Sequence, residues 1–137
     1  MGLTILDAGV IIAVLDSADF HHESAAQALT AARARGDTLA LPASAYTECL
    51  VAPYRRGAEA AAIVDEFVDA LPARVEPASR AIGNAAAALR ADHAGSLRLP
   101  DALVIATAIV LRADRILTTD SRWPTVGVAV VVVSGST

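Results

Sequence analysis

The sequence contains no lysine, and all eleven of its basic residues are arginines. Sites that hold a phosphate group with a lysine side chain, such as the P-loop, are therefore excluded. A single cysteine, Cys49, excludes an internal disulfide, and no cysteine or histidine residues have the spacing of a zinc site. No apolar run reaches the roughly 18–20 residues that cross a bilayer. Asp7 interrupts the apolar N-terminal segment, which lacks a basic leader, so we expect a cytoplasmic protein with no secretory signal and no membrane association.

Positive charge is also scarce. The formal net charge is −4, which argues against a nucleic-acid-coating protein that relies on a basic surface. Hydrophobic residues make up 55% of the 137 residues, so the chain can bury a core and is not disordered. This length suits one compact domain, and no linker, repeat or shift in composition divides it. We therefore predict a single domain over residues 1–137.

Strands and helices are expected to alternate along the chain. Apolar runs predict strands at 3–6, 115–119 and 128–133, with weaker candidates at 38–41 and 73–76. Amphipathic patterns predict helices at 22–35, 43–52, 58–70, 78–94 and 101–113. Alternation of this kind is typical of an α/β domain with a mostly parallel sheet that helices cover on both faces.

Four acidic residues fall near one edge of this sheet. Asp7 follows the strand at 3–6, Asp120 follows the strand at 115–119, and Asp101 opens a helix. Glu48 lies in the helix after the second strand. Open parallel sheets bind their ligands at the carboxyl ends of the strands. Carboxylates that converge there repel one another unless a cation neutralises them, and ligands of oxygen alone suit Mg²⁺ or Mn²⁺ better than zinc.

Each acid also has a purely structural interpretation. Asp7 could cap a helix that starts near residue 8, and Asp101 could complement the dipole of its own helix. Asp120 could be a turn residue at a strand end, and Glu48 could be an edge acid with its carboxylate in water. All four interpretations would have to hold at once, so the residues together favour a metal site.

The chain resembles the PIN-domain ribonucleases, and in size and layout the VapC-type toxins of bacterial toxin–antitoxin pairs. Four short stretches carry the resemblance, in the order in which the family has them: "ILDAGVII", "PASAYTECL", "LPDALVIATA" and "ILTTD". They contain Asp7, Glu48, Asp101 and, in the last, Thr118 with Asp120. Gly9 departs from the family, which often has serine or asparagine there. Ser121, Arg122 and Trp123 stand where some relatives carry a further acid.

The resemblance implies a PIN-like three-layer sandwich and an Mg²⁺-dependent endoribonuclease toxin, with Mn²⁺ as a possible substitute. It would hydrolyse RNA phosphodiester bonds, inhibit translation, form a homodimer and be neutralised by a cognate antitoxin. Asp7, Asp101 and Asp120 would hold the metal, while Glu48 would either bind it through water or orient the attacking water. Thr118 would steady Asp120 or a metal-bound water, or serve only as a strand residue.

Two other functions stay open. One is a catalytically silent PIN-fold module that binds a protein partner, which the missing side chain at Gly9 supports. The other is aspartyl-phosphate chemistry, as in receiver domains or phosphatases of the haloacid-dehalogenase type. These enzymes normally need a lysine near the phosphate, and the sequence has none. Arginines near the third and fourth motifs could contact phosphate; they are Arg98, Arg112, Arg115 and Arg122.

Overall fold

A parallel sheet forms the centre of the protein. The computed structural model describes residues 2–135, and its strands are β1 (Leu3–Leu6), β2 (Thr38–Pro42), β3 (Ala73–Glu76), β4 (Arg115–Thr118) and β5 (Val130–Val132). They lie in the order β3-β2-β1-β4-β5, and every neighbouring pair is parallel. The predicted α/β class and parallel sheet are therefore confirmed.

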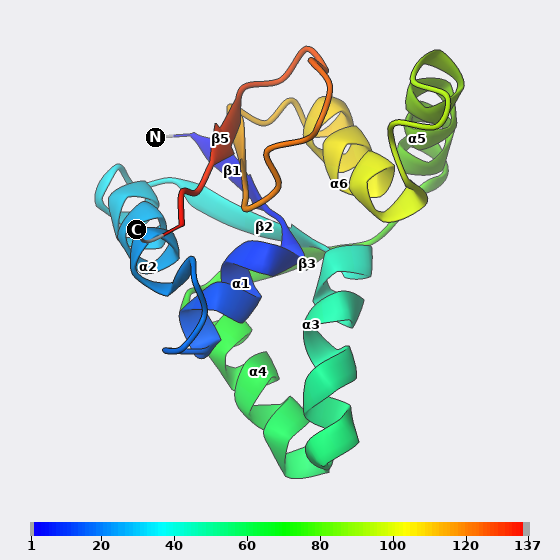
Figure 1. The fold of residues 1–137 in the computed structure, drawn as a ribbon. Helices are drawn as coiled ribbons and strands as arrows, with labels where there is room; N and C mark the ends of the chain where they lie inside the picture. Colours follow the sequence, from blue (N-terminus) through cyan, green and yellow to red (C-terminus); the bar gives the residue numbers. More distant parts are fainter. Residues whose placement is uncertain (1, 136–137) are drawn as a thin grey trace.

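Helices cover both faces of this sheet. They are α1 (Ala8–Leu15), α2 (His22–Ala34), α3 (Ala43–Arg56), α4 (Ala58–Ala70), α5 (Arg80–Asp92) and α6 (Leu99–Val110). Figure 1 shows α5 and α6 on one side of the sheet, α1 and α2 on the other, and the pair α3 and α4 extending beyond it. Within residues 2–135, no helix is long and apolar enough to cross a bilayer.

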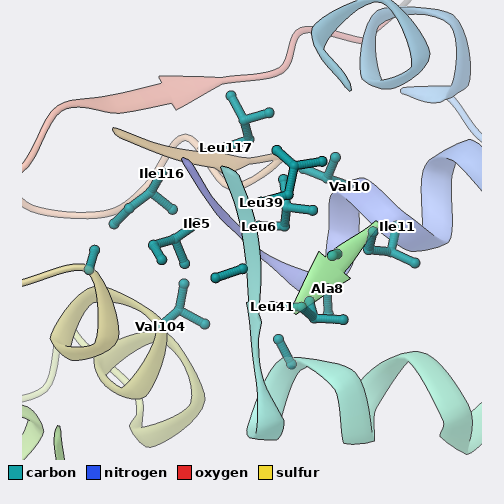
Figure 2. Close-up of a cluster of buried hydrophobic side chains, with 14 of the residues drawn as sticks. Ile5, Leu6, Ala8, Val10, Ile11, Leu39, Leu41, Val104, Ile116 and Leu117 are labelled. Atoms are coloured by element: carbon teal, nitrogen blue, oxygen red, sulfur yellow. The ribbon is translucent and has the colours of Figure 1, made fainter. Parts of the chain in front are cut away.

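The core lies on both sides of β1 and β4. Ile5 and Ile116 point toward Val104 of α6, whereas Leu117 lies on the side of Val10 in α1 (Figure 2). These side chains are buried. A parallel strand that is covered on both faces has no solvent side, which explains why the strand sequences are continuously apolar rather than alternating.

The helix predicted at 43–52 is longer than expected, because it continues through Pro53 to Arg56. Proline removes a backbone hydrogen bond and crowds the preceding turn, so the sequence favours a stop at this point. In the structure Ala45, Cys49 and Pro53 form one buried stripe of α3, and α3 packs along α1 and α4. Burial of this stripe outweighs the cost of the lost backbone hydrogen bond at Pro53. The helix therefore continues to Arg56, and Gly57 is its C-cap.

Other boundaries shift by a few residues. The strand predicted at 128–133 is observed only over Val130–Val132, and the helix predicted at 101–113 begins at Leu99 and ends at Val110. The chain leaves α6 through Arg112, which has a φ of 53°. This left-handed residue breaks the helical hydrogen-bond pattern earlier than the apolar periodicity indicates.

A buried carboxylate joins three strands at the amino edge of the sheet. Asp37, just before β2, accepts hydrogen bonds from the Thr4 hydroxyl in β1 (2.9 Å) and from Arg35 Nη2 (3.0 Å). Arg115, the first residue of β4, also donates to this carboxylate, whose side chain is only 1% exposed. Burial alone would raise the pKa of Asp37, but the hydrogen bonds and charges of its partners outweigh it, and the pKa is lowered.

Replacing Asp37 with asparagine is expected to lower the free energy of unfolding by about 2 kcal/mol near neutral pH, because both arginines lose the carboxylate they share. A lowered folded-state pKa means that the contribution is complete above the unfolded value of about 3.9 and is lost as the pH falls through the folded value. Urea unfolding across this range should therefore show the difference from wild type shrinking in acid.

The control is Asp69→Asn, at an exposed position of α4, which should leave stability unchanged. A loss of stability in Asp37→Asn that is equal at all pH values would show that the charge of Asp37 does not stabilise the fold.

Candidate functional site

The carboxyl ends of β1 and β4 meet at the point where the strand order reverses. From β1 the chain proceeds to β2 on one side, while β4 lies against the other side of β1. Asp7 directly follows β1, and Asp120 lies two residues beyond the end of β4. In open parallel sheets a reversal of this kind opens a crevice that holds ligands. The topology therefore puts these two acids at the expected binding edge.

Asp7 is fixed by contacts on both of its carboxylate oxygens. It is the N-cap of α1, and its Oδ1 accepts a hydrogen bond from the backbone N–H of Ala8 at 2.9 Å. Its Oδ2 accepts a hydrogen bond from the Thr118 hydroxyl at 2.7 Å. The capping role expected for Asp7 is therefore real. It leaves lone pairs free on both oxygens, because each can accept more than one hydrogen bond.

Thr118 connects this carboxylate to the segment that follows β4. Its side chain is completely buried. Besides donating to Asp7, its oxygen accepts a hydrogen bond from the backbone N–H of Asp120 at 3.1 Å. The hydroxyl thus contacts the carboxylate of Asp7 and the backbone of Asp120, the residue that Thr118 is expected to steady.

Asp101 and Asp120 line one cleft between the start of α6 and the segment after β4, together with Arg98, Arg122 and Trp123. Arg122 donates to both carboxylate oxygens of Asp120, each at 3.2 Å. Arg98 Nε lies 3.8 Å from Asp101 Oδ2. The indole N–H of Trp123 is buried and has no hydrogen-bond partner of normal length within residues 2–135, yet it lies near enough to Asp101 to lower the pKa of that carboxylate. The two acids are therefore flanked by cations and by one weakly engaged donor.

The electrostatic surroundings shift the pKa values of Asp7, Asp101 and Asp120 in different directions. Burial raises the pKa of Asp7, the bonds from Thr118 and Ala8 offset part of this, and the charges of Asp101 and Glu48 raise it further. Burial also raises the pKa of Asp101, more than Arg98 lowers it. The hydrogen bond from Arg122 lowers the pKa of Asp120. Asp7 and Asp101 are thus the two carboxylates whose negative charge is poorly compensated.

Glu48 lies at the margin of this cluster. Its side chain is exposed on α3, in a groove that also contains Arg56, Ile12 and Leu15. The neighbouring Cys49 points inward and is buried, and burial, followed by the charges of Asp7 and Glu48, raises its pKa to about 12. Asp101 and Asp120 thus share one cleft, and Thr118 joins the carboxylate of Asp7 to the backbone of Asp120. Glu48 is exposed, although its charge acts on Asp7.

The chemical type of these side chains suits a hard divalent cation. Their donors are carboxylate oxygens, which Mg²⁺ and Mn²⁺ prefer, and two of them have raised pKa values that a cation would lower again. Among residues 2–135, however, no three acidic, histidine or cysteine side chains converge closely enough to hold a metal.

The four candidate phosphate-binding arginines divide into two pairs. Arg98 and Arg122 line the acidic cleft. Arg115 donates to Asp37 at the opposite edge of the sheet, and Arg112 follows the far end of α6. The hydroxyl of Thr119 lies against Gly9, a contact that the sequence does not indicate.

Comparison with known proteins relates the whole chain to one family. The family model described as the PIN domain matches residues 4–129. Among curated proteins, none matches this sequence. Similar solved structures include a toxin–antitoxin complex from Klebsiella pneumoniae, with 23% identity, a TM-score of 0.73, and coverage of 97% of this chain and 99% of that chain.

Two further structures share the fold at lower identity. VapBC2 from Rickettsia felis, bound to a DNA fragment from the promoter, has 14% identity and a TM-score of 0.78, covering 95% of this chain and 98% of that chain. VapC20 from Mycobacterium tuberculosis, described as a sarcin-ricin loop cleaving toxin, has 17% identity and a TM-score of 0.67, covering 82% and 86%. These likenesses confirm the three-layer fold.

Without divalent cations, Asp7 and Asp101 are expected to make the protein more stable as the pH falls from neutrality toward the unfolded-state carboxyl pKa of about 3.9. The raised pKa values of Asp7 and Asp101 mean that the folded state takes up protons before the unfolded chain does. Asp7→Asn keeps a capping side chain but removes the charge. It should raise the unfolding midpoint at neutral pH by a few degrees and flatten the pH dependence, as measured by circular dichroism in EDTA. A lower midpoint would show that the charge of Asp7 is not a source of instability.

Proposed function

Since the chain belongs to the PIN-domain family, we propose that it is a metal-dependent endoribonuclease whose active site contains Asp7, Asp101 and Asp120. One observation carries this proposal. The carboxylate of Asp7 is held by hydrogen bonds from Thr118 and Ala8, yet burial, with a smaller addition from the charges of Asp101 and Glu48, still raises its pKa. A protein does not gain stability from such an arrangement, whereas a site that recruits a cation needs it.

The residues around the cleft have distinct tasks in this mechanism. Mg²⁺, when bound by Asp7, Asp101 and Asp120, would supply a Lewis acid for the scissile phosphate and lower the pKa of an attacking water. Thr118 keeps the Asp7 carboxylate in one orientation. Glu48, which is exposed at the margin of the site, would bind the cation through a water molecule or orient the attacking water. Arg98 and Arg122 leave the carboxylates and contact RNA phosphates, for which the planar guanidinium is well suited.

We further propose that the protein acts in the cytoplasm as a VapC-type toxin, inhibits translation, and is neutralised by a cognate antitoxin. Two of the similar structures support this: the toxin–antitoxin complex from Klebsiella pneumoniae, and VapC20, which is described as a cleaving toxin. So does a groove between α1, α3 and α4 that Ile12, Leu15 and Val64 line beside Glu48. An antitoxin segment with apolar residues and one basic side chain would fill this groove and reach the acids. The same family resemblance supports a homodimer.

Purified protein is expected to cleave RNA in Mg²⁺ or Mn²⁺ and to lose this activity in EDTA. Asp7→Asn, Asp101→Asn and Asp120→Asn should each reduce the rate at least about 100-fold, because each removes a charge that holds the cation. Glu48→Gln should cost about tenfold, because its side chain is exposed. Gel electrophoresis of defined tRNA, rRNA and mRNA fragments gives the rates.

Product ends and a matched control complete the test. Attack by water leaves 5′-phosphate and 3′-hydroxyl ends, whereas a 2′,3′-cyclic phosphate would show attack by the RNA itself and contradict metal-assisted hydrolysis. Asp69→Asn, an exposed acid on α4, should cleave like wild type. If the wild-type protein cleaves none of the RNAs and its unfolding midpoint does not change on addition of Mg²⁺, the ribonuclease proposal is wrong. The protein is then a catalytically silent interaction module.

Arg122→Gln is expected to tighten Mg²⁺ binding about two- to fivefold, since the cation no longer competes with an exposed ion pair at Asp120. The same variant should bind RNA more weakly, because a phosphate contact is lost. Isothermal titration with Mg²⁺ alone, followed by RNA-binding measurements in Ca²⁺, separates the two effects. Arg112→Gln, at the far end of α6, is the control. Weaker Mg²⁺ binding by Arg122→Gln would mean that this arginine supports the metal site rather than competing with it.

A further inference from the structure

Trp123 lies between two hollows of the surface. Its side chain lines the acidic cleft together with Asp101, and it also lines an adjoining cavity beside Val130 of β5. The segment that carries it leaves β4, loops toward α6 and returns to β5 (Figure 1). The ring packs against the core, and its indole N–H is buried. Packing therefore holds this donor at the wall of the acidic cleft.

The buried N–H has the carboxylate of Asp101 within its range. Within residues 2–135 it has no hydrogen-bond partner of normal length, yet it is near enough to lower the pKa of Asp101. A buried donor that lacks a partner costs stability, and a phenylalanine at this position would fill much of the same space without that cost. This cost indicates that the N–H of Trp123 has a role at Asp101.

Arg98, the other neighbour of Asp101, is held there only weakly. Its Nε lies 3.8 Å from Asp101 Oδ2, which is longer than a hydrogen bond, and its side chain is 77% exposed. Exposed ion pairs of this kind contribute little to stability, so a cation or an RNA phosphate can replace Arg98. The ring of Trp123 is packed against the core. Its N–H therefore stays beside Asp101 when Arg98 leaves.

The segment from Thr118 to Trp123 thus carries a neutral donor for each of the two poorly compensated carboxylates. Thr118 donates to Asp7 at the start of α1, and Trp123 lies beside Asp101 in the first turn of α6. A neutral donor directs a carboxylate without cancelling its charge. Donors of this kind orient the side chains that hold metals in proteins.

We propose that Trp123 is a positioning residue of the acidic site, and that its indole N–H donates to the carboxylate of Asp101 and orients it for a divalent cation when Arg98 is displaced. This inference rests on the proposed ribonuclease function. It adds to the site a residue that the four acidic motifs do not include. Asp101 then has a fixed neutral donor, as Asp7 has in Thr118.

The contact between Trp123 and Asp101 can be measured without catalysis, because Trp123 is the only tryptophan in the sequence. Its indole N–H gives one resonance in the proton–nitrogen NMR spectrum of the full chain in EDTA at neutral pH. Asp101→Asn should shift this resonance, since a charged acceptor forms the stronger hydrogen bond. Asp69→Asn is the matched control and should leave it in place. A resonance that does not respond to Asp101→Asn would overturn the proposal.

The role of this contact is tested by Trp123→Phe, which keeps an aromatic ring and removes the N–H. We expect Mg²⁺ binding, measured by isothermal titration, to weaken about tenfold. RNA cleavage by this variant should recover when the Mg²⁺ concentration is raised about tenfold. Val126→Ala is the packing control, because Val126 lies in the same segment and packs against the core but does not line the acidic cleft.

Val126→Ala should lower the unfolding midpoint and leave Mg²⁺ affinity unchanged. An unchanged Mg²⁺ affinity in Trp123→Phe would overturn the proposal. An equal loss of affinity in Val126→Ala would also overturn it, because that result would show that Trp123 acts only through packing of the segment.

These outcomes are separable from failure of the proposed function. If wild type cleaves RNA and binds Mg²⁺, while Asp101→Asn leaves the indole resonance in place and Trp123→Phe binds Mg²⁺ normally, only the role of Trp123 is wrong. If wild type neither cleaves RNA nor binds Mg²⁺, the ribonuclease proposal and this inference are both wrong.

Discussion

The hydrogen bond from the Thr118 hydroxyl to the Asp7 carboxylate, at 2.7 Å, is the contact on which the acidic site depends. It links the end of β4 to the start of α1 across the reversal of strand order. Thr118 also accepts the backbone N–H of Asp120, so a single buried oxygen sets the relative positions of two acids. Because this donor is neutral, it fixes the direction of Asp7 without cancelling its charge, and the charge remains available to a cation.

Buried carboxylates at the two edges of the sheet have opposite surroundings. At the amino edge, Asp37 is paired with Arg35 and Arg115, and its pKa is lowered. At the carboxyl edge, Asp7 and Asp101 have raised pKa values because burial dominates. The first arrangement stabilises the folded state at neutral pH and the second destabilises it. The buried ion pairs of the sheet therefore lie at its amino edge, whereas the arginines that pair with Asp101 and Asp120 at the carboxyl edge are exposed.

Much of the fold could be predicted because it depends on local pattern. Continuous apolar runs indicated the parallel strands, and alternation with amphipathic segments indicated helices on both faces. The placement of Asp7 and Asp120 at one edge followed from their positions after strands. Local rules failed at Pro53, where burial of a helical stripe outweighs the loss of one backbone hydrogen bond. That balance depends on contacts with α1, which lies far from Pro53 in the sequence, and with α4, which follows it. The residues around Pro53 therefore do not reveal it.

The sequence by itself determined the order of the elements, the central position of the buried strands and the set of acids near one edge, since each follows from the spacing of neighbouring residues. Only the tertiary structure decided which groups those acids contact. It directs Glu48 into solvent, bonds the carboxylate of Asp7 to Thr118, and places the hydroxyl of Thr119 against Gly9. The physical reason is that a side chain's direction and partners depend on the packing of elements that are distant in sequence, and no local pattern encodes that packing.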